Sequence, residues 1–84
     1  MLPKATSAKP AETVPSATEL LLRLASRIKE LRLEKNLTQE DAFNDTGIHF
    51  GRIEQGKRDV SFTSLKKVCD YFQLTLEEFF SKGF

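Results

Sequence analysis

Three segments of the chain each begin with a serine or threonine that is followed, three residues later, by an acidic residue. The pairs are Ser16 with Glu19, Thr38 with Asp41, and Thr75 with Glu78. In this spacing the hydroxyl accepts a hydrogen bond from a backbone N–H of the first helical turn, and the carboxylate bonds back to the capping residue. Each pair therefore predicts the start of a helix, which restricts the chain to folds built from several short helices.

Apolar residues recur at three- and four-residue steps after these starts, and no alternating β pattern interrupts them. The first expected helix covers about 17–35, the second runs from the Thr38 cap to near Asn44, and the third runs from a Thr46 cap to before Gly56. A fourth helix follows a Ser61 cap, and a short fifth helix follows Thr75. The candidate core residues are Leu21, Leu24, Ile28, Leu31, Ala42, Phe43, Phe50, Ile53, Phe62, Leu65, Val68, Cys69, Phe72, Leu76, Phe79 and Phe80. We therefore expect a compact all-α domain of five helices, in which the second and third form a helix-turn-helix unit.

A chain of 84 residues allows one small domain. All three prolines lie in residues 1–15, which lack aromatic residues and any apolar period, so we expect a flexible tail over 1–15 and a domain over 16–84. No apolar run approaches the ~20 residues that cross a bilayer, and the N-terminus lacks the order of a signal peptide. These features predict a cytoplasmic protein that does not bind membranes.

The reactive residues are too few for most catalytic or metal sites. One cysteine, Cys69, and one histidine, His49, exclude a disulfide framework and the common zinc sites, so we expect no metal and no cofactor. No third residue completes a catalytic group with this pair, and the adjacent Glu77 and Glu78 point to different parts of a helix surface. The sequence therefore predicts a protein that is not an enzyme. Its net charge of +1 excludes a histone-like polycation but not a DNA-binding protein.

Four stretches of sequence, in order, carry a resemblance to a known family. They are RIKELRLEKNLTQED at 27–41, TGI at 46–48, RIEQGKR at 52–58, and SFTSLKKVCDYFQLTLEEFF at 61–80. Together they resemble the lambda-repressor-like (XRE-type) helix-turn-helix DNA-binding domains over roughly residues 20–81. The resemblance implies a sequence-specific transcriptional regulator that binds double-stranded DNA.

The helix-turn-helix unit is shorter than the family pattern. The resembled family usually has about seven residues at this place, whereas only four lie between Ile48 and Ile53, so about one helical turn is missing. If the second helix is the shorter one, Thr46 caps the third helix and Phe50 faces inward together with Ile53. If the third helix is shorter, the recognition helix is a stub. We prefer the first interpretation, because threonine is a favourable N-cap residue and residues 44–45 are of types that favour turns.

The alignment with the family implies which residues face the DNA. They are Thr46, Gly47, Ile48, His49 and Arg52. Arg52 can pair with the O6 and N7 atoms of guanine, and Ile48 can contact a thymine methyl group. His49 can bond a base edge or a phosphate, and Gly47 allows a close approach of the backbone.

Other residues are candidates for contact with the DNA backbone. In the resembled family, a glutamine at the position of Gln39 grips a phosphate. Lys57 and Arg58 follow the third helix and would sit beside the phosphates, and Arg23 and Arg27 are weaker candidates.

The C-terminal segment gathers Phe79, Phe80 and Phe84, which is more aromatic surface than a short last helix can hide. We expect these residues in a homodimer interface, since two copies on a two-fold site would offset the weak charge of one monomer. The alternative is a protein-interaction module on the same fold that has lost DNA binding, or an antitoxin that acts through a protein partner. Three features favour that alternative: the low net charge, the shortened helix-turn-helix, and the presence of Gly47 and Ile48 where polar base-reading residues would be expected.

Overall fold

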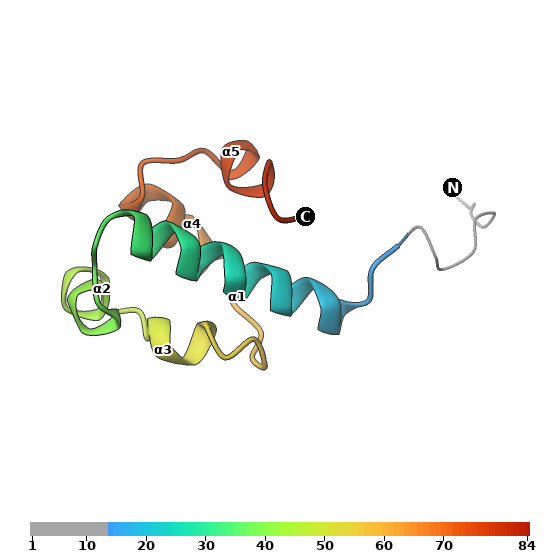
Figure 1. The fold of residues 1–84 in the computed structure, drawn as a ribbon, viewed down its shortest axis with the longest axis horizontal. Helices are drawn as coiled ribbons and strands as arrows, with labels where there is room; N and C mark the ends of the chain where they lie inside the picture. Colours follow the sequence, from blue (N-terminus) through green and yellow to red (C-terminus); the bar gives the residue numbers. More distant parts are fainter. Residues whose placement is uncertain (1–13) are drawn as a thin grey trace.

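The computed structural model describes residues 14–84, which form five helices and no strand (Figure 1). The helices are α1 (Ala17–Glu34), α2 (Gln39–Thr46), α3 (Phe50–Ile53), α4 (Phe62–Tyr71) and α5 (Leu76–Phe80). α1 crosses the molecule, with α2 and α3 on one side of it and α5 on the other. The predicted all-α fold is confirmed. The tail predicted for residues 1–15 lies outside the described residues, apart from its last two positions.

No helix within residues 14–84 has both the length and the hydropathy that crossing a bilayer requires.

The three predicted capping pairs all form. Each hydroxyl accepts a hydrogen bond from the backbone N–H three residues on, and each carboxylate accepts one from its capping residue, at 2.9–3.1 Å. The backbone N–H of Ser16 lowers the pKa of Glu19, and that of Thr38 lowers the pKa of Asp41. Local sequence therefore sets where α1, α2 and α5 begin.

The hydrophobic core joins all five helices. Its buried members are Ile28, Leu31, Ala42, Phe50, Leu65, Val68, Cys69, Phe72 and Phe79. Phe50 is fully buried, and the rings of Tyr71 and Phe72 meet it edge-on, with centroids 6.2 and 6.1 Å away. This packing holds the short α3 against α4.

Three residues that we expected in the core are exposed instead. Phe43, Phe62 and Phe80 are 38%, 67% and 43% exposed. Phe43 and Phe80 each follow a fully buried residue, Ala42 and Phe79, and adjacent positions on a helix point about 100° apart. Phe62 is the first residue of α4, and the buried residues of that helix begin only at Leu65.

A buried ion pair connects the end of α1 to the end of α3. The Arg32 guanidinium donates two hydrogen bonds to the Glu54 carboxylate, at 2.8 and 2.9 Å, and a third to the Leu37 carbonyl at 2.7 Å. The bonds to Glu54 raise the pKa of Arg32. Such a pair fixes one relative position of the two helices, because breaking it would leave an unpaired buried charge.

Candidate nucleic-acid interface

The turn between α2 and α3 differs from the one that the sequence predicted. Thr46 is the last residue of α2, and its hydroxyl donates to the Ala42 carbonyl at 2.7 Å and accepts from the Ile48 N–H at 3.0 Å. Gly47 then takes a φ of 77°, and its N–H bonds the Phe43 carbonyl at 2.7 Å. The prediction that Thr46 caps the third helix is therefore wrong, because its hydroxyl is used within α2 and the left-handed Gly47 ends that helix.

The missing turn thus belongs to the recognition helix, contrary to our preferred interpretation. α2 has eight residues, whereas α3 has four. Phe50 is buried and Ile53 half-buried, so both face inward as predicted. Gly51 lies against Gln39, since a Cβ added there would stand 3.1 Å from Gln39 Oε1. Arg52 is the one exposed residue of α3.

A hollow of about 330 Å³, the α3 cleft, opens between α3 and the start of α4. Its walls include Thr46, Gly47, Ile48, His49, Arg52, Arg58, Asp59, Ser61, Ser64 and Lys67. Six of the eight predicted DNA-binding residues, all except Gln39 and Lys57, therefore meet at one cavity. Arg52, Arg58 and Lys67 supply three cations against the single carboxylate of Asp59, which makes the α3 cleft electropositive.

The sequence did not predict the α4 side of this cleft. Ser61, Ser64 and Lys67 follow one another at three-residue steps, so they share one face of the first turns of α4. Ser61 Oγ accepts a hydrogen bond from the Ser64 N–H at 3.1 Å and thereby caps the helix. The three-residue spacing is visible in the sequence. That this face of α4 turns toward α3 is decided by packing.

Two predicted phosphate contacts lie outside the α3 cleft. Gln39 is exposed at the start of α2, where its Nε2 donates to Glu54 Oε1 at 3.1 Å. Lys57 is exposed in the connection that leads from α3 to α4. The ion pair that holds α3 therefore also positions Gln39, since Glu54 bonds Arg32 and Gln39 with the same carboxylate.

An aromatic pair stands at the entrance to α3. The rings of Phe43 and His49 are stacked, with centroids 4.6 Å apart and planes 26° from parallel. Both residues are exposed, and His49 lines the α3 cleft. His49 precedes α3 without capping it through its side chain. Its ring therefore lies over α2 rather than on the end of α3.

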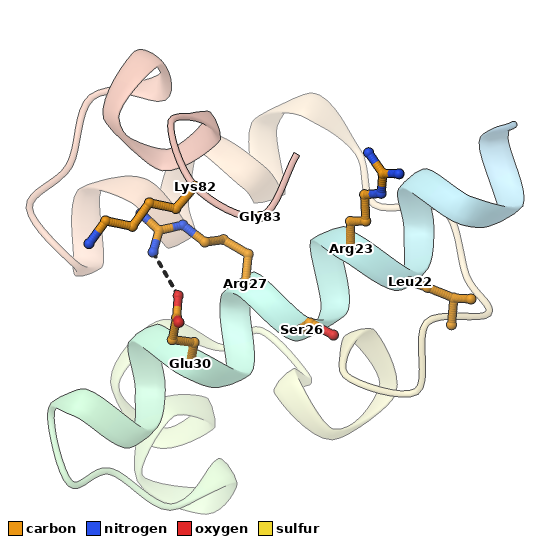
Figure 2. Close-up of a pocket in the computed structure, with 7 residues that line it drawn as sticks. All are labelled: Leu22, Arg23, Ser26, Arg27, Glu30, Lys82 and Gly83. Atoms are coloured by element: carbon orange, nitrogen blue, oxygen red, sulfur yellow. Dashed lines mark hydrogen bonds and ion pairs between the residues drawn. The ribbon is translucent and has the colours of Figure 1, made fainter. Parts of the chain in front are cut away.

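The weaker phosphate candidates are engaged elsewhere. Arg27 is only 6% exposed, and its guanidinium donates to the Phe79 and Glu78 carbonyls at 2.8 and 3.2 Å. It also pairs with Glu30 at 3.0 Å and reaches from α1 toward the C-terminal segment (Figure 2). Arg23 and Arg27 both line a hollow of about 360 Å³ beside the C-terminal segment, and Arg23 Nη1 donates a hydrogen bond to the Phe84 carbonyl at 3.1 Å. Arg27 is not available to DNA, because it satisfies carbonyl groups at the end of α5.

The three C-terminal phenylalanines have different environments. Phe79 is fully buried in the core of the chain, which corrects its predicted place in a dimer interface. Phe80 and Phe84 are exposed, with ring centroids 4.8 Å apart. They border an apolar groove of about 390 Å³ that is also lined by Ala17, Leu20, Leu21, Leu24, Asp59 and Leu65. Asp59, in the connection between α3 and α4, lines both the apolar groove and the α3 cleft.

Comparison with known proteins identifies the family of the chain. A family model described as helix-turn-helix matches residues 28–79, from the second half of α1 into α5. The control protein C.MunI of a Mycoplasma species is 34% identical over 67 residues, which are 75% of this chain and 90% of that protein. No solved structure matches the chain. The chain belongs to the XRE-type helix-turn-helix family of DNA-binding transcriptional regulators.

Proposed function

We propose that the protein binds a two-fold symmetric operator as a homodimer and regulates transcription by occupying it. The observation that carries this proposal is the electropositive α3 cleft, where Arg52 of the recognition helix faces Arg58 and Lys67. Arg52 is suited to a guanine edge, while the other two cations are suited to phosphates. Similarity to a control protein supports a role in regulating gene expression.

The base-reading residues of this proposal are His49, Ile48 and Arg52. Gly47 lets the protein backbone approach the DNA closely, because it has no side chain and no atom beyond its chain neighbours lies within 4 Å of the place where its Cβ would be. Thr46 contributes by holding the turn, since its hydroxyl is bonded within α2. Ile48 and His49 directly precede α3, and Arg52 belongs to it. The N-terminal end of the recognition helix is the end that enters the major groove in helix-turn-helix proteins.

Phosphate contacts complete the proposed interface. Gln39 is exposed in the first turn of α2, and Lys57 and Arg58 are exposed after α3. Phosphate contacts of this kind set the position and the affinity of the protein, whereas base contacts set the choice of sequence.

The apolar groove supports the homodimer. Phe80, Phe84 and Leu20 expose apolar surface around it, and exposed apolar patches of this kind mark contact sites between proteins. The net charge of +1 gives one copy few phosphate contacts, so two copies on one operator would bind far better at physiological salt.

Fluorescence-anisotropy titration with a randomised duplex pool, at low and at physiological salt, tests the proposed function. Sequencing of the bound fraction should recover a two-fold symmetric motif, and binding should weaken steeply as salt rises. Enrichment of a single asymmetric half-site would refute the dimer on DNA. Absence of binding at low salt would refute operator binding and favour a protein-interaction module.

A further inference from the structure

The recognition helix offers few side chains to DNA. Of its four residues, Phe50 is buried, Ile53 is half-buried, and Gly51 has no side chain. Arg52 alone is left to reach a base edge from α3. Recognition helices normally use several side chains for this purpose. Neighbouring elements must therefore supply further base contacts if the site is to choose a sequence.

Phe43 of α2 is linked to the α3 cleft through His49, because its ring stacks on His49 and His49 lines the cleft. It is one helical turn beyond Gln39, and residues four apart share a helix face. Gln39 touches α3 at Gly51, so the face that carries Phe43 is the face beside α3. The buried neighbour Ala42 fills the core position, which leaves Phe43 38% exposed. Core packing therefore does not account for a phenylalanine at this place.

The turn after α2 builds the stack between Phe43 and His49. Gly47 reverses the chain in a left-handed conformation, and its N–H bonds the Phe43 carbonyl at 2.7 Å. Two residues later the His49 ring lies on the Phe43 ring at 4.6 Å. Both residues are exposed, and His49 lines the α3 cleft together with Arg52. The stacking limits the orientations of the imidazole.

We propose that Phe43 and His49 act as one base-reading unit, an inference that rests on the proposed binding of duplex DNA. His49 hydrogen-bonds a base edge in the major groove. Phe43 holds the imidazole plane, and its exposed edge contacts the 5-methyl group of a thymine next to that base. The chemistry fits, because apolar side chains recognise thymine through this methyl group and polar ones recognise base edges.

The test uses the duplex selected from the randomised pool, with each thymine replaced in turn by deoxyuridine. Deoxyuridine removes the 5-methyl group and keeps the pairing, so the wild-type protein should lose about fourfold in affinity at one position in each half-site. Phe43→Ala should lose that sensitivity. Phe43→Leu keeps an apolar contact without the stack, so it should keep the sensitivity.

Coupling between the two residues is the second readout. The effects of Phe43→Ala and His49→Ala on base preference should not add in the double variant, because each disrupts the same unit. Phe62→Ala is the matched control, since Phe62 is an exposed phenylalanine of α4, whereas the ring stacked on His49 is that of Phe43. Circular dichroism checks that each variant is folded.

Two results would overturn the inference and leave operator binding intact. One is a Phe43→Ala variant that responds to deoxyuridine as the wild type does. The other is full additivity of the Phe43 and His49 substitutions on a duplex that the wild type binds specifically. A wild-type protein that binds no duplex would overturn the proposed function itself.

Discussion

At the scale of single residues, Arg52 is the side chain on which the choice of sequence depends most. It is exposed, belongs to α3, and lines the α3 cleft. We expect Arg52→Ala to weaken binding to the selected operator by about 1–3 kcal/mol and to relax preference at one base pair. Anisotropy titration against single-base variants of the operator measures both effects. Weaker binding with unchanged base preference would assign Arg52 to a phosphate.

Lys67 has a different expected role, because it lies in the second turn of α4 and not in the recognition helix. Lys67→Ala should weaken binding to all duplexes alike and reduce the slope of log affinity against log salt by about 1. Lys66→Ala is the matched control, since Lys66 pairs with Asp70 and does not line the α3 cleft. Equal salt slopes for the two variants would remove Lys67 from the interface.

At the scale of elements, Gly47 ends α2 and sets the direction of α3. Its φ of 77° lies in the left-handed region, while the space around it is open. A Cβ at this position therefore meets no atom, and its only cost is backbone strain. We expect Gly47→Ala to reduce the free energy of unfolding by about 1–2 kcal/mol, and Gly47→Asn by less. Urea unfolding provides the comparison, and an alanine variant as stable as the wild type would contradict the strained turn.

The helix caps give the free energy of unfolding a dependence on pH. The hydrogen bond from the Thr38 N–H lowers the pKa of Asp41 in the folded chain. The stabilisation is therefore complete above the pKa of the unfolded carboxyl group and is lost as the pH falls through the lower, folded value. In urea unfolding, the wild type should exceed Asp41→Asn in stability at neutral pH, and the difference should shrink in acid. A difference that does not change with pH would contradict this origin.

At the scale of the whole molecule, the apolar groove decides between a monomer and a dimer. Phe80→Ser should leave the chain folded, because Phe80 is 43% exposed, and should shift the mass in light scattering from dimer to monomer. Phe62→Ser is the control, since Phe62 is more exposed but does not line the groove. A wild-type chain that is monomeric at tens of micromolar, a range that detects weak dimers, would exclude the proposed interface.

Much of this architecture was predictable from the sequence, because it depends on residues that are close together in the chain. Ser16, Thr38 and Thr75 start helices through hydrogen bonds that span three residues. The buried stripe that contains Ile28 and Leu31 follows from the helical period alone. The family followed from motifs such as residues 52–58, and the helix-turn-helix match confirms it.

The site itself needed the tertiary structure. The hydroxyl of Thr46 can cap the following helix or bond a carbonyl of its own helix, and the local sequence fits both arrangements. In the structure it donates to the Ala42 carbonyl within α2. Arg27 looks like a surface cation until α5, about fifty residues later, brings the Phe79 carbonyl to it. The α4 wall of the α3 cleft, with Lys67, likewise depends on how α4 packs against Phe50. Short-range hydrogen bonds thus determined where the helices begin, whereas contacts between distant segments decided which side chains meet, because only packing fixes how one helix turns toward another.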